Sequence, residues 1–498
     1  MQPIQKITIV GGGTAGWIAA AVLAHSFPRE QVQIELVESE EIKTIGIGES
    51  TVPPFVNLLR RLGIPEQEFM AATSATYKLG IQFVDWQAGA SPYFHPFGSL
   101  GNPQSNYDFY QCWLRAREQD PLLQLQDFSP CSVMAQEGKF FFPHQARNTP
   151  IGGANYALHV DSHRVGQYLA NYAKNLGVKH TLGQVQRVVK RDDDFIEHLE
   201  LEDGRRIEGD FFIDCSGFRA LLIGEALNED FIDWSHYLPC DSAVAVKTEV
   251  QHPIPPYTRA SAQKSGWSWR IPLTNAVGHG YVYASAFCDD QTAKATLLRN
   301  LGSPRLAEPR IIRFKSGHRR QSWRGNCLAL GLAAGFIEPL EATSIHLITR
   351  GLSFFLRYYP SRACNPALVN EFNRRMTADF EEVRDFIMLH YAASKRSDSP
   401  FWQWWQSVEL PDSLQQRIAL FRAQGAQREG VDELFRASSW QSIFEGMGIR
   451  PAHPCARSNN LPIEQIYSEL KKTKRAIAGM VDALPSHDEM LPSTASFL

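Results

Sequence analysis

A short apolar strand, a glycine-rich turn and an alanine-rich helix follow one another near the N-terminus. Residues 7–10 read ITIV, the turn at 11–16 reads GGGTAG, and a helix is predicted from about Ala15 to His25. A second apolar run, VQIELVES at 32–39, is typical of the next strand. Strand, G-x-G-x-x-G turn, helix and strand form a βαβ unit, so the chain is predicted to begin with a parallel Rossmann-type sheet in an α/β fold.

The same turn predicts a dinucleotide site. Gly11 makes the tight turn, Gly13 lets a pyrophosphate approach the backbone, and Gly16 lets the helix pack closely on the strand. The free N–H groups and the positive dipole end of the helix favour a phosphate. The residues expected at the dinucleotide are therefore those of the turn and the helix start, Gly11, Gly13, Thr14, Ala15 and Gly16. Glu38, 22 residues after Gly16, is placed to accept hydrogen bonds from an adenosine ribose.

The net charge and the cysteine content limit the classes of binding partner and the cellular compartment that we expect. The 498-residue chain has a formal net charge of -3, so it lacks the basic surface expected of a nucleic-acid or membrane binder. Its eight cysteines contain no C-x-x-C pair, so neither a metal cluster nor a disulfide framework is predicted. The nucleotide-binding turn explains the apolar N-terminal stretch, and no other run reaches the roughly 18 apolar residues that span a bilayer. We expect a soluble, cytoplasmic protein.

Later segments favour FAD as the dinucleotide. A helix is predicted at 161–178, and three antiparallel strands follow it and end in GDFFIDCSGF at 209–218. The stretch NCLALGLAAG at 326–335 is typical of a buried strand that runs into small residues, and its Gly331 is expected at the flavin. This order resembles the FAD-dependent monooxygenases of the hydroxylase type over about the first 350 residues. The sequence shows one G-x-G-x-x-G fingerprint, whereas a chain that also kept NAD(P) bound would commonly show two.

Six further stretches narrow this resemblance. They are GIGESTVPPF (46–55), TYKLGIQF (76–83), FHPFG (94–98), GWSWRIP (266–272), GFIEPLEATSIHLI (335–348) and DFIMLHYAASKRSDSPFW (385–402). Together they resemble the flavin-dependent tryptophan halogenase family. The resemblance implies that FADH2, supplied by a separate NADH-dependent flavin reductase, reacts with O2 to a C4a-hydroperoxide. It further implies that bromide or chloride attacks the distal oxygen and that hypohalous acid then moves through a tunnel to an aromatic substrate.

Trp267 and Trp269 of the GWSWRIP stretch are predicted to form one aromatic wall. In an extended segment alternate side chains share a face, so the two indoles lie side by side. Buried strands often carry aromatic residues for packing alone, and this interpretation stays open. The resemblance implies that the pair separates the flavin from the substrate, with Ile271 and Pro272 continuing the wall.

Lys78 and Glu341 are the candidate catalytic residues. The resemblance places Lys78 at the end of the tunnel, where it holds hypohalous acid by a hydrogen bond or takes up the halogen as a haloamine. The alternation of residues 77–83 as one strand puts Lys78 opposite the apolar side chains, as in many solvated lysines. By resemblance Glu341 lies beside Lys78, steers the halogen and helps to remove the ring proton. If Pro339 starts a helix, Glu341 is otherwise a first-turn acid that complements the helix dipole.

Two loops are assigned to the halide and the flavin. The resemblance implies a halide site at the backbone N–H groups of Thr343 and Ser344, where a helix start suits an anion. It also implies that GIGESTVPPF is a strap over the flavin, with Glu49 and Ser50 as candidate flavin contacts. The alternative explanation is that Ser50 or Thr51 caps the helix that begins near Pro53.

The substrate is predicted to be a flat aromatic molecule. By resemblance, His95 and Phe97 form one side of an indole slot. For the other side, residues 438–454 contain Trp440, a candidate substrate contact, and Glu445, but not the tyrosine pair of the tryptophan-specific enzymes. Unpaired charged groups of free tryptophan would be costly to bury there, so indole or an indole derivative is the expected substrate. A one-sided slot predicts reaction at C3, the most nucleophilic carbon, and bromide in preference to chloride.

The expected architecture has three parts. Residues 1–355 form the FAD-binding domain with an interleaved mixed β-sheet substrate region, 356–483 form a helical substrate-side part, and 484–498 form a flexible tail rich in proline and serine. A homodimer is compatible with this sequence.

Two other functions stay open, namely a flavin-dependent aromatic hydroxylase, which the tryptophan wall disfavours, and a flavin-binding protein without turnover.

Overall fold

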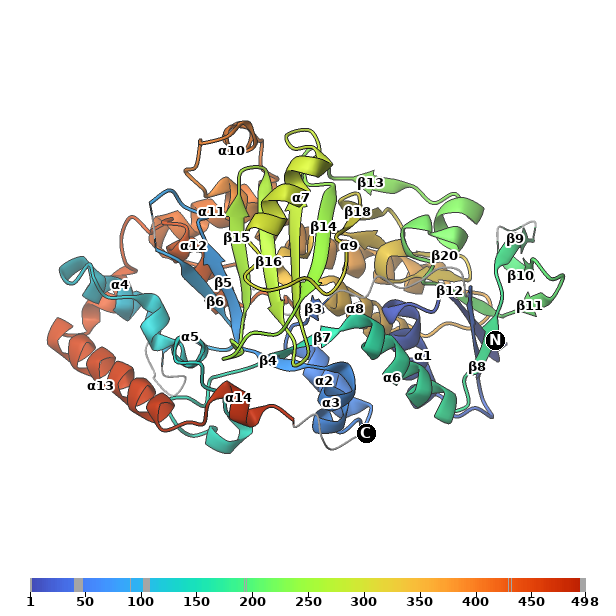
Figure 1. Cartoon of the computed structure of the whole chain (residues 1–498), viewed down its shortest axis with the longest axis horizontal. Helices are drawn as coiled ribbons and strands as arrows, with labels where there is room; N and C mark the ends of the chain where they lie inside the picture. The colour runs from blue at the N-terminus through green and yellow to red at the C-terminus, as the bar shows by residue number, and fades with distance from the viewer. Residues whose placement is uncertain are drawn as a thin grey trace.

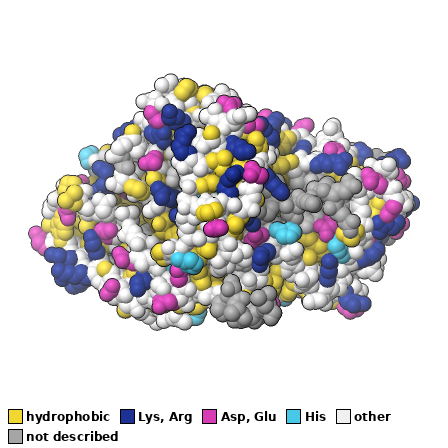
Figure 2. Space-filling view, in the orientation of Figure 1, with side chains coloured by type: hydrophobic (Ala, Val, Ile, Leu, Met, Phe, Trp, Pro, Cys, Tyr) yellow, Lys and Arg dark blue, Asp and Glu magenta, His cyan; other side chains and the backbone are white. Residues whose placement is uncertain are grey.

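The computed structural model describes residues 2–39, 48–89, 91–101, 108–191, 193, 195–428, 430 and 432–492. A six-stranded sheet lies at one end, a seven-stranded sheet in the middle, and α13 (Ile463–Asp482) with α4 (Phe109–Gln119) at the other end (Figure 1). Positive and negative side chains are interspersed over the face shown in Figure 2. None of the helices in the described ranges combines the length and apolar character that a membrane span needs.

The predicted Rossmann-type sheet is confirmed. Its strand order is β20-β21-β12-β1-β2-β8, and β1 pairs in parallel with β2 on one side and with β12 on the other. The strands are β1 (Lys6–Val10), β2 (Gln33–Glu38), β8 (Lys179–Leu182), β12 (Phe211–Asp214), β20 (Trp323–Arg324) and β21 (Cys327–Ala329). The helices α1 (Thr14–Ser26) and α6 (Ser162–Asn175) pack against each other beside this sheet, as the sequence predicts. The three antiparallel strands expected before β12 are β9 (Val185–Lys190), β10 (Ile196–Leu201) and β11 (Arg206–Glu208).

A mixed seven-stranded sheet forms the middle of the molecule, also as expected. Its order is β18-β14-β17-β16-β15-β5-β6, in which β15 and β5 are parallel and the other neighbours are antiparallel. The strands are β5 (Gly80–Val84), β6 (Tyr93–Pro96), β14 (Ser242–Thr248), β15 (Thr258–Gln263), β16 (Gly266–Pro272), β17 (Val277–Tyr283) and β18 (Arg310–Arg313). Helix α7 (Asp290–Arg299) packs on β17 and β14. This sheet carries the tryptophan stretch on β16 and His95 on β6.

A small antiparallel sheet joins these two larger sheets. It consists of β3 (Gly48–Ser50), β7 (Ala157–Asp161) and β4 (Thr76–Lys78), with β7 in the centre. The prediction that residues 77–83 form one strand is wrong, because the chain leaves this sheet at Leu79 and enters the seven-stranded sheet at Gly80. The N–H group of Leu79 donates to the carbonyl oxygen of Pro256 at 2.7 Å, outside both ladders. Lys78 therefore ends a short internal strand and does not lie on a solvent-facing edge.

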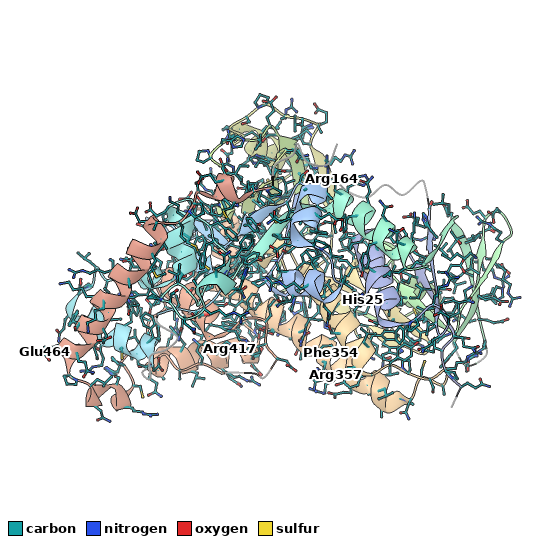
Figure 3. All side chains as sticks on the ribbon, turned by 90° about the horizontal axis from the view of Figure 1, so that it is seen from below. His25, Arg164, Phe354, Arg357, Arg417 and Glu464 are labelled. Carbon is teal, nitrogen blue, oxygen red and sulfur yellow. The ribbon has the colours of Figure 1, made fainter. Side chains whose placement is uncertain are left out.

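Helices cover the rest of the molecule. The N-terminal half contributes α2 (Pro54–Arg61), α3 (Glu66–Thr73) and α5 (Pro130–Gln136), and a third small sheet contains β13 (Phe231–Asp233), β19 (Gly317–Arg319) and β22 (Gly335–Phe336). The C-terminal helices are α8 (Ser344–Arg357), α9 (Pro366–Ala392), α10 (Pro400–Trp405), α11 (Asp412–Gln424), α12 (Ala437–Gly446), α13 and α14 (His487–Met490). In Figure 3, Glu464 of α13 lies at one end of the molecule, well away from His25 of α1.

The C-terminal segment differs from its prediction as a loose tail. Residues 484–492 are packed on the protein, and Ser486 forms a capping box with Glu489 at the start of α14. His487 is 1% exposed and lies between the small sheet and the loop before β15. The remainder of the predicted tail, 493–498, lies outside the described residues. Burial of His487 explains the difference, because its ring satisfies two backbone groups of the core.

Candidate active site

A cavity of about 570 Å³ lies at the carboxyl ends of β1 and β2, where the strand order changes direction. Residues predicted at the flavin and at the halide line it together: Gly11, Gly13, Thr14, Ala15, Glu38, Glu49, Ser50, Gly331, Thr343 and Ser344. Gly16 does not belong to the described lining. A Cβ atom on Gly16 would lie 1.9 Å from the carbonyl oxygen of Gly11, so this glycine permits close packing of α1 on the turn.

The backbone of the glycine turn is free to receive a pyrophosphate. Gly11 has a φ of +111°, and a Cβ atom there would lie 2.2 Å from the carbonyl oxygen of Cys215. Gly13 is the N-cap of α1, and no side chain in the part of the chain that the structure describes caps this helix start. The first N–H groups of the helix therefore face the cavity without a side-chain partner, as binding of a phosphate requires. The residues present fit the pyrophosphate of FAD.

Glu38 stands at the end of β2 as predicted and lines the cavity beside the turn. Its Oε1 lies 2.6 Å from Nε2 of His180 on the neighbouring strand β8. A Cβ atom on Gly12 would overlap the Glu38 carboxylate, so this glycine makes room for the acid. His180 orients Glu38, and no pattern in the sequence pointed to this histidine.

The part of the strap that the structure describes begins at Gly48, since Gly46 and Ile47 lie outside the described residues. Glu49 and Ser50 both line the cavity. Burial raises the pKa of Glu49 to about 7, with a hydrogen bond from Ser162 acting in the opposite direction. The capping explanation for Ser50 is wrong, because α2 has no side-chain cap.

Ser50 instead begins a buried hydrogen-bond chain. Its Oγ lies 3.1 Å from Oγ1 of Thr258, which lies 2.9 Å from Nε2 of His159, whose Nδ1 lies 2.8 Å from Oγ1 of Thr76. The Thr76 hydroxyl donates its one hydrogen to the carbonyl oxygen of Pro272, so it accepts from Nδ1–H of His159. Burial holds the pKa of His159 well below its usual range, so the ring is neutral and its Nε2 accepts from Thr258. Thr258 then accepts from Ser50, and the chain ties the strap to β4 and to the tryptophan strand.

Trp267 and Trp269 share one face of β16, as predicted. Their ring centroids are 6.0 Å apart with the planes tilted by 53°, and both rings line the cavity together with Ile271. Pro272 does not belong to the described lining. The two indoles are 1% and 6% exposed, and their Nε1 atoms have no hydrogen-bond partner within the described part of the chain. The pair is therefore an apolar wall of the nucleotide cavity.

Lys78 is completely buried, which excludes the interpretation as a solvated lysine. Its Nζ donates to the carbonyl oxygen of Thr51 at 3.1 Å and lies 4.9 Å from the centroid of the Phe97 ring. Burial lowers the pKa of Lys78 to about 7, although the negative charge of Glu341 raises it in part. An amine with this pKa is a hydrogen-bond donor and, in its neutral fraction, a nucleophile.

A second histidine from the end of the chain supports the Lys78 strand. The N–H group of Tyr77 donates to Nε2 of His487 at 3.2 Å, and Nδ1 of His487 lies 2.8 Å from the carbonyl oxygen of Ile254. Burial lowers the pKa of His487 to about 4, so the ring is neutral and bonds both backbone groups. This support was missed because the sequence pattern near His487 predicts a loose tail.

Glu341 differs from the first-turn acid expected for a helix starting at Pro339. Residues Pro339–Glu341 form a separate 3-10 turn, and Ala342 with a φ of +58° breaks the chain direction before α8 begins at Ser344. The Glu341 carboxylate is 1% exposed, with Nδ1 of His95 2.9 Å from Oε2 and Nε2 of His390 3.0 Å from Oε1. Burial alone would raise the pKa of Glu341, but the two histidines outweigh it and lower the pKa to about 2.

His390 is a site residue that sequence analysis did not single out. It lies on α9 without any exposure, and its Nδ1 is 2.9 Å from the hydroxyl of Tyr93 on β6. Its stretch, 385–402, matched the family only as a whole. Tyr93, His390, Glu341 and His95 form one buried polar row.

Thr343 and Ser344 lie where an anion site requires them. Both line the cavity, with Thr343 as the N-cap of α8 and Ser344 as its first residue. Among the described residues no side chain caps this helix start, which leaves its first N–H groups available to an anion.

The predicted substrate residues separate into two groups. His95 and Phe97 lie close together, with ring centroids 6.4 Å apart. Trp440 lies behind Phe386 as seen from His95. The ring centroid of Phe386 is 5.4 Å from that of His95 and 4.8 Å from that of Trp440. Phe435, 6.3 Å from the His95 ring and stacked on Phe386, takes the place expected for Trp440.

The environment of Trp440 is that of a core residue. Its indole Nε1 donates to the carbonyl oxygen of Phe435, and the guanidinium of Arg417 lies 4.1 Å from its ring centroid. Arg417 is labelled in Figure 3 within the helical C-terminal part. Glu445 is also occupied, since it accepts from Tyr110 at 2.7 Å and from Arg117 at 2.6 Å.

Three features together define a flavin-dependent oxidoreductase. The Rossmann-type cavity fits a nucleotide, two tryptophans of the adjoining mixed sheet line this cavity, and a buried lysine lies outside it. The chain belongs to the tryptophan halogenase family, whose model matches residues 6–461. It is 34% identical to tryptophan 6-halogenase SttH of Streptomyces toxytricini over 97% of each chain. Its structure is similar to that of Xcc4156, a flavin-dependent halogenase from Xanthomonas campestris, with 40% identity and a TM-score of 0.94. It is also similar to BrvH, a flavin-dependent halogenase from Brevundimonas sp. BAL3, with 38% identity and a TM-score of 0.93, and each of these two matches covers 98% of both chains. The predicted family and enzyme class, a flavin-dependent halogenase, are thereby confirmed.

Proposed function

We propose that this enzyme takes FADH2 from a separate NADH-dependent flavin reductase and uses O2 to oxidise a halide to hypohalous acid. The bound flavin would supply the oxidising chemistry. The turn at Gly11 and Gly13 would hold its pyrophosphate, and the N–H groups of Thr343 and Ser344 would hold the halide. Lys78 would receive the hypohalous acid and present the halogen to an aromatic ring.

The burial of Lys78 carries this proposal. An uncompensated lysine is costly to bury, and Lys78 has no carboxylate within ion-pair distance in the described part of the chain. It lies outside the cavity lined by Trp267 and Trp269, next to Phe97. A hydroxylase would instead need its substrate inside the cavity, in direct reach of the flavin.

We further propose an indole-type substrate, with indole preferred to free tryptophan. Phe97, Phe386 and Phe435 surround His95 with flat apolar surfaces that suit an indole. Glu445, the acid that could have paired with an amino group, is bound to Tyr110 and Arg117. A ring held by its faces alone reacts at its most nucleophilic carbon, C3, and bromide, which is easier to oxidise, is preferred to chloride.

One reaction tests the activity. Purified protein is mixed with a flavin reductase, NADH, FAD, O2, indole and either bromide or chloride, and the products are identified by mass. Halogenated indole supports the proposal, oxygenated indole supports a hydroxylase, and FAD binding without product from several indoles supports a flavin-binding protein.

A competition between indole and tryptophan tests the substrate assignment. Both are offered at equal concentration with bromide, and the ring positions of the products are determined. We expect 3-bromoindole to predominate. Predominant halogenation of tryptophan on its benzene ring would mean that other residues of the slot fix the amino acid.

A further inference from the structure

His95 has a buried ring nitrogen that the rest of the described chain leaves without a partner. The side chain lies on β6 and is 2% exposed. Its Nδ1 lies 2.9 Å from Oε2 of Glu341, whereas its Nε2 makes no hydrogen bond within the described residues. Buried polar atoms are nearly always bonded, so an exception calls for a ligand or a chemical function.

The partner of Nδ1 determines what Nε2 can do. Glu341 is an ionised carboxylate and can only accept, so Nδ1 of His95 carries a hydrogen. In the neutral ring Nε2 then holds a lone pair and is a proton acceptor. The aromatic neighbours of the His95 ring are Phe97, Phe386 and Phe435, with centroids 6.4, 5.4 and 6.3 Å from its own, and these side chains offer no hydrogen to that lone pair.

Glu341 itself is badly suited to accept a proton. Each of its oxygens has an imidazole nitrogen within 3.0 Å, from His95 on one side and from His390 on the other. His390 is in turn fixed by the hydroxyl of Tyr93 at 2.9 Å. A carboxylate held in this way orients a histidine and stabilises its protonated form, as the aspartate of a Ser-His-Asp triad does.

We propose that His95 is the base that removes the ring proton during halogenation, with Glu341 as its orienting partner. This inference rests on the function proposed above. The π electrons of the ring form the new carbon–halogen bond. The bond between the halogen and its oxygen or nitrogen donor breaks, and the electron pair of this bond stays on the donor atom. The ring C–H bond then breaks, its electron pair restores aromaticity, and the proton goes to Nε2 of His95. Hypohalous acid leaves hydroxide behind, and the proton from His95 converts it to water. A neutral haloamine on Lys78 leaves a nitrogen anion behind, and the same proton converts it to the free amine.

The positions of the halogen donor and the base agree with this assignment. Only Leu79 separates Lys78 from the strand β5, which pairs with β6, so Lys78 and His95 come from adjoining parts of the fold. Phe97 is a neighbour of both, since its ring centroid lies 4.9 Å from Nζ of Lys78 and 6.4 Å from the ring centroid of His95. A substrate ring against Phe97 is therefore within reach of both groups.

The isotope effect on turnover with ring-deuterated indole tests the proposal. In the wild type we expect equal kcat values for ordinary and C3-deuterated indole, because proton loss from the halogenated ring is fast. In His95→Phe, which keeps an aromatic side chain and removes the base, kcat should fall about a hundredfold. Proton loss then limits turnover, so ordinary indole should react measurably faster than deuterated indole.

Two further variants make the result specific. Phe97→Leu alters the same slot without removing a base, so its kcat falls without an isotope effect. His95→Gln provides a second replacement should His95→Phe fold poorly, which circular dichroism and FAD affinity report. It should show the same isotope effect as His95→Phe.

Three outcomes would overturn the assignment. Loss of activity in the His95 variants without an isotope effect would show that the ring only shapes the slot. Full activity in His95→Gln would remove His95 from proton transfer. An isotope effect in Glu341→Gln combined with none in either His95 variant would identify Glu341 as the base. Failure of the proposed function is a separate result, because the wild type itself would then yield no halogenated product.

Discussion

Replacement of Lys78 by methionine should abolish halogenation without weakening the protein. Lowering the pKa of a lysine from 10.5 to about 7 corresponds to about 5 kcal/mol at about 1.36 kcal/mol per unit. That free energy disfavours the folded state at pH 7, and Lys78→Met removes it. The variant loses the hydrogen bond to the carbonyl oxygen of Thr51, which contributes only about 1 kcal/mol. We therefore expect a net gain of a few kcal/mol in the free energy of unfolding.

The gain should depend on pH in a defined direction. Between pH 7 and 10.5 the unfolded chain keeps the Lys78 proton that the folded chain has lost, so the stability of the wild type rises with pH. The advantage of Lys78→Met should therefore shrink as the pH is raised from 7 towards 9. Urea unfolding at both pH values measures this difference.

Activity and flavin oxidation are measured in the same preparations. We expect brominated indole to fall at least a hundredfold while reduced FAD is still reoxidised by O2. Lys139→Met is a matched control, since its Nζ also donates to a backbone carbonyl, that of Leu484 at 2.8 Å, and the described cavity lining does not include it. Bromination retained above about a tenth of wild type, a loss of about 1.4 kcal/mol of barrier, would exclude Lys78 from the mechanism. A clear loss of stability in Lys78→Met would show that the lysine is kept for the fold.

Three further predictions concern the wall, the C-terminal support and the glycine turn. Trp269→Ala should raise the ratio of oxygenated to halogenated indole at unchanged FAD affinity. Product masses measure this ratio, and an unaltered ratio would indicate that Trp269 serves packing alone. With its pKa lowered to about 4, His487 binds a proton in the unfolded chain between pH 6.5 and 4 that it does not bind in the folded chain. Wild-type stability should therefore fall over that range, and His487→Gln should reduce the fall by up to about 3 kcal/mol in urea unfolding, whereas an identical fall would refute the burial argument. Gly16→Val would overlap the carbonyl oxygen of Gly11, so the variant should purify without flavin absorbance, and normal FAD content would contradict the packing assigned to this glycine.

Local sequence patterns predicted those parts of the molecule in which neighbouring residues act together. The turn at 11–16 has one workable structure, because Gly11 needs a positive φ and Gly16 has no room for a Cβ atom. The tryptophan wall follows from the two-residue period of an extended strand. Both features depend on a few consecutive residues, and both were found.

The missed features depend on residues far apart in the chain. Tyr77 and His487 are separated by 410 positions, and His95 and Glu341 by 246, so no local period relates them. The break of the predicted strand at Leu79 was missed because an alternating pattern continues through it. Its cause is a hydrogen bond to Pro256, which lies in a distant loop.

The strap shows how a short segment serves two sites at once. Ser50 lines the flavin cavity with its side chain, and the next residue, Thr51, points its carbonyl oxygen at Nζ of Lys78. Ser50 is also bonded through Thr258 and His159 to the strand that ends in Lys78. A shift of the strap therefore changes both the wall of the flavin cavity and the hydrogen bond of the lysine. Because Ser50, the last residue of β3, and the adjacent Thr51 contact the two sites, the separation of the sites is set by backbone geometry and not by flexible side chains.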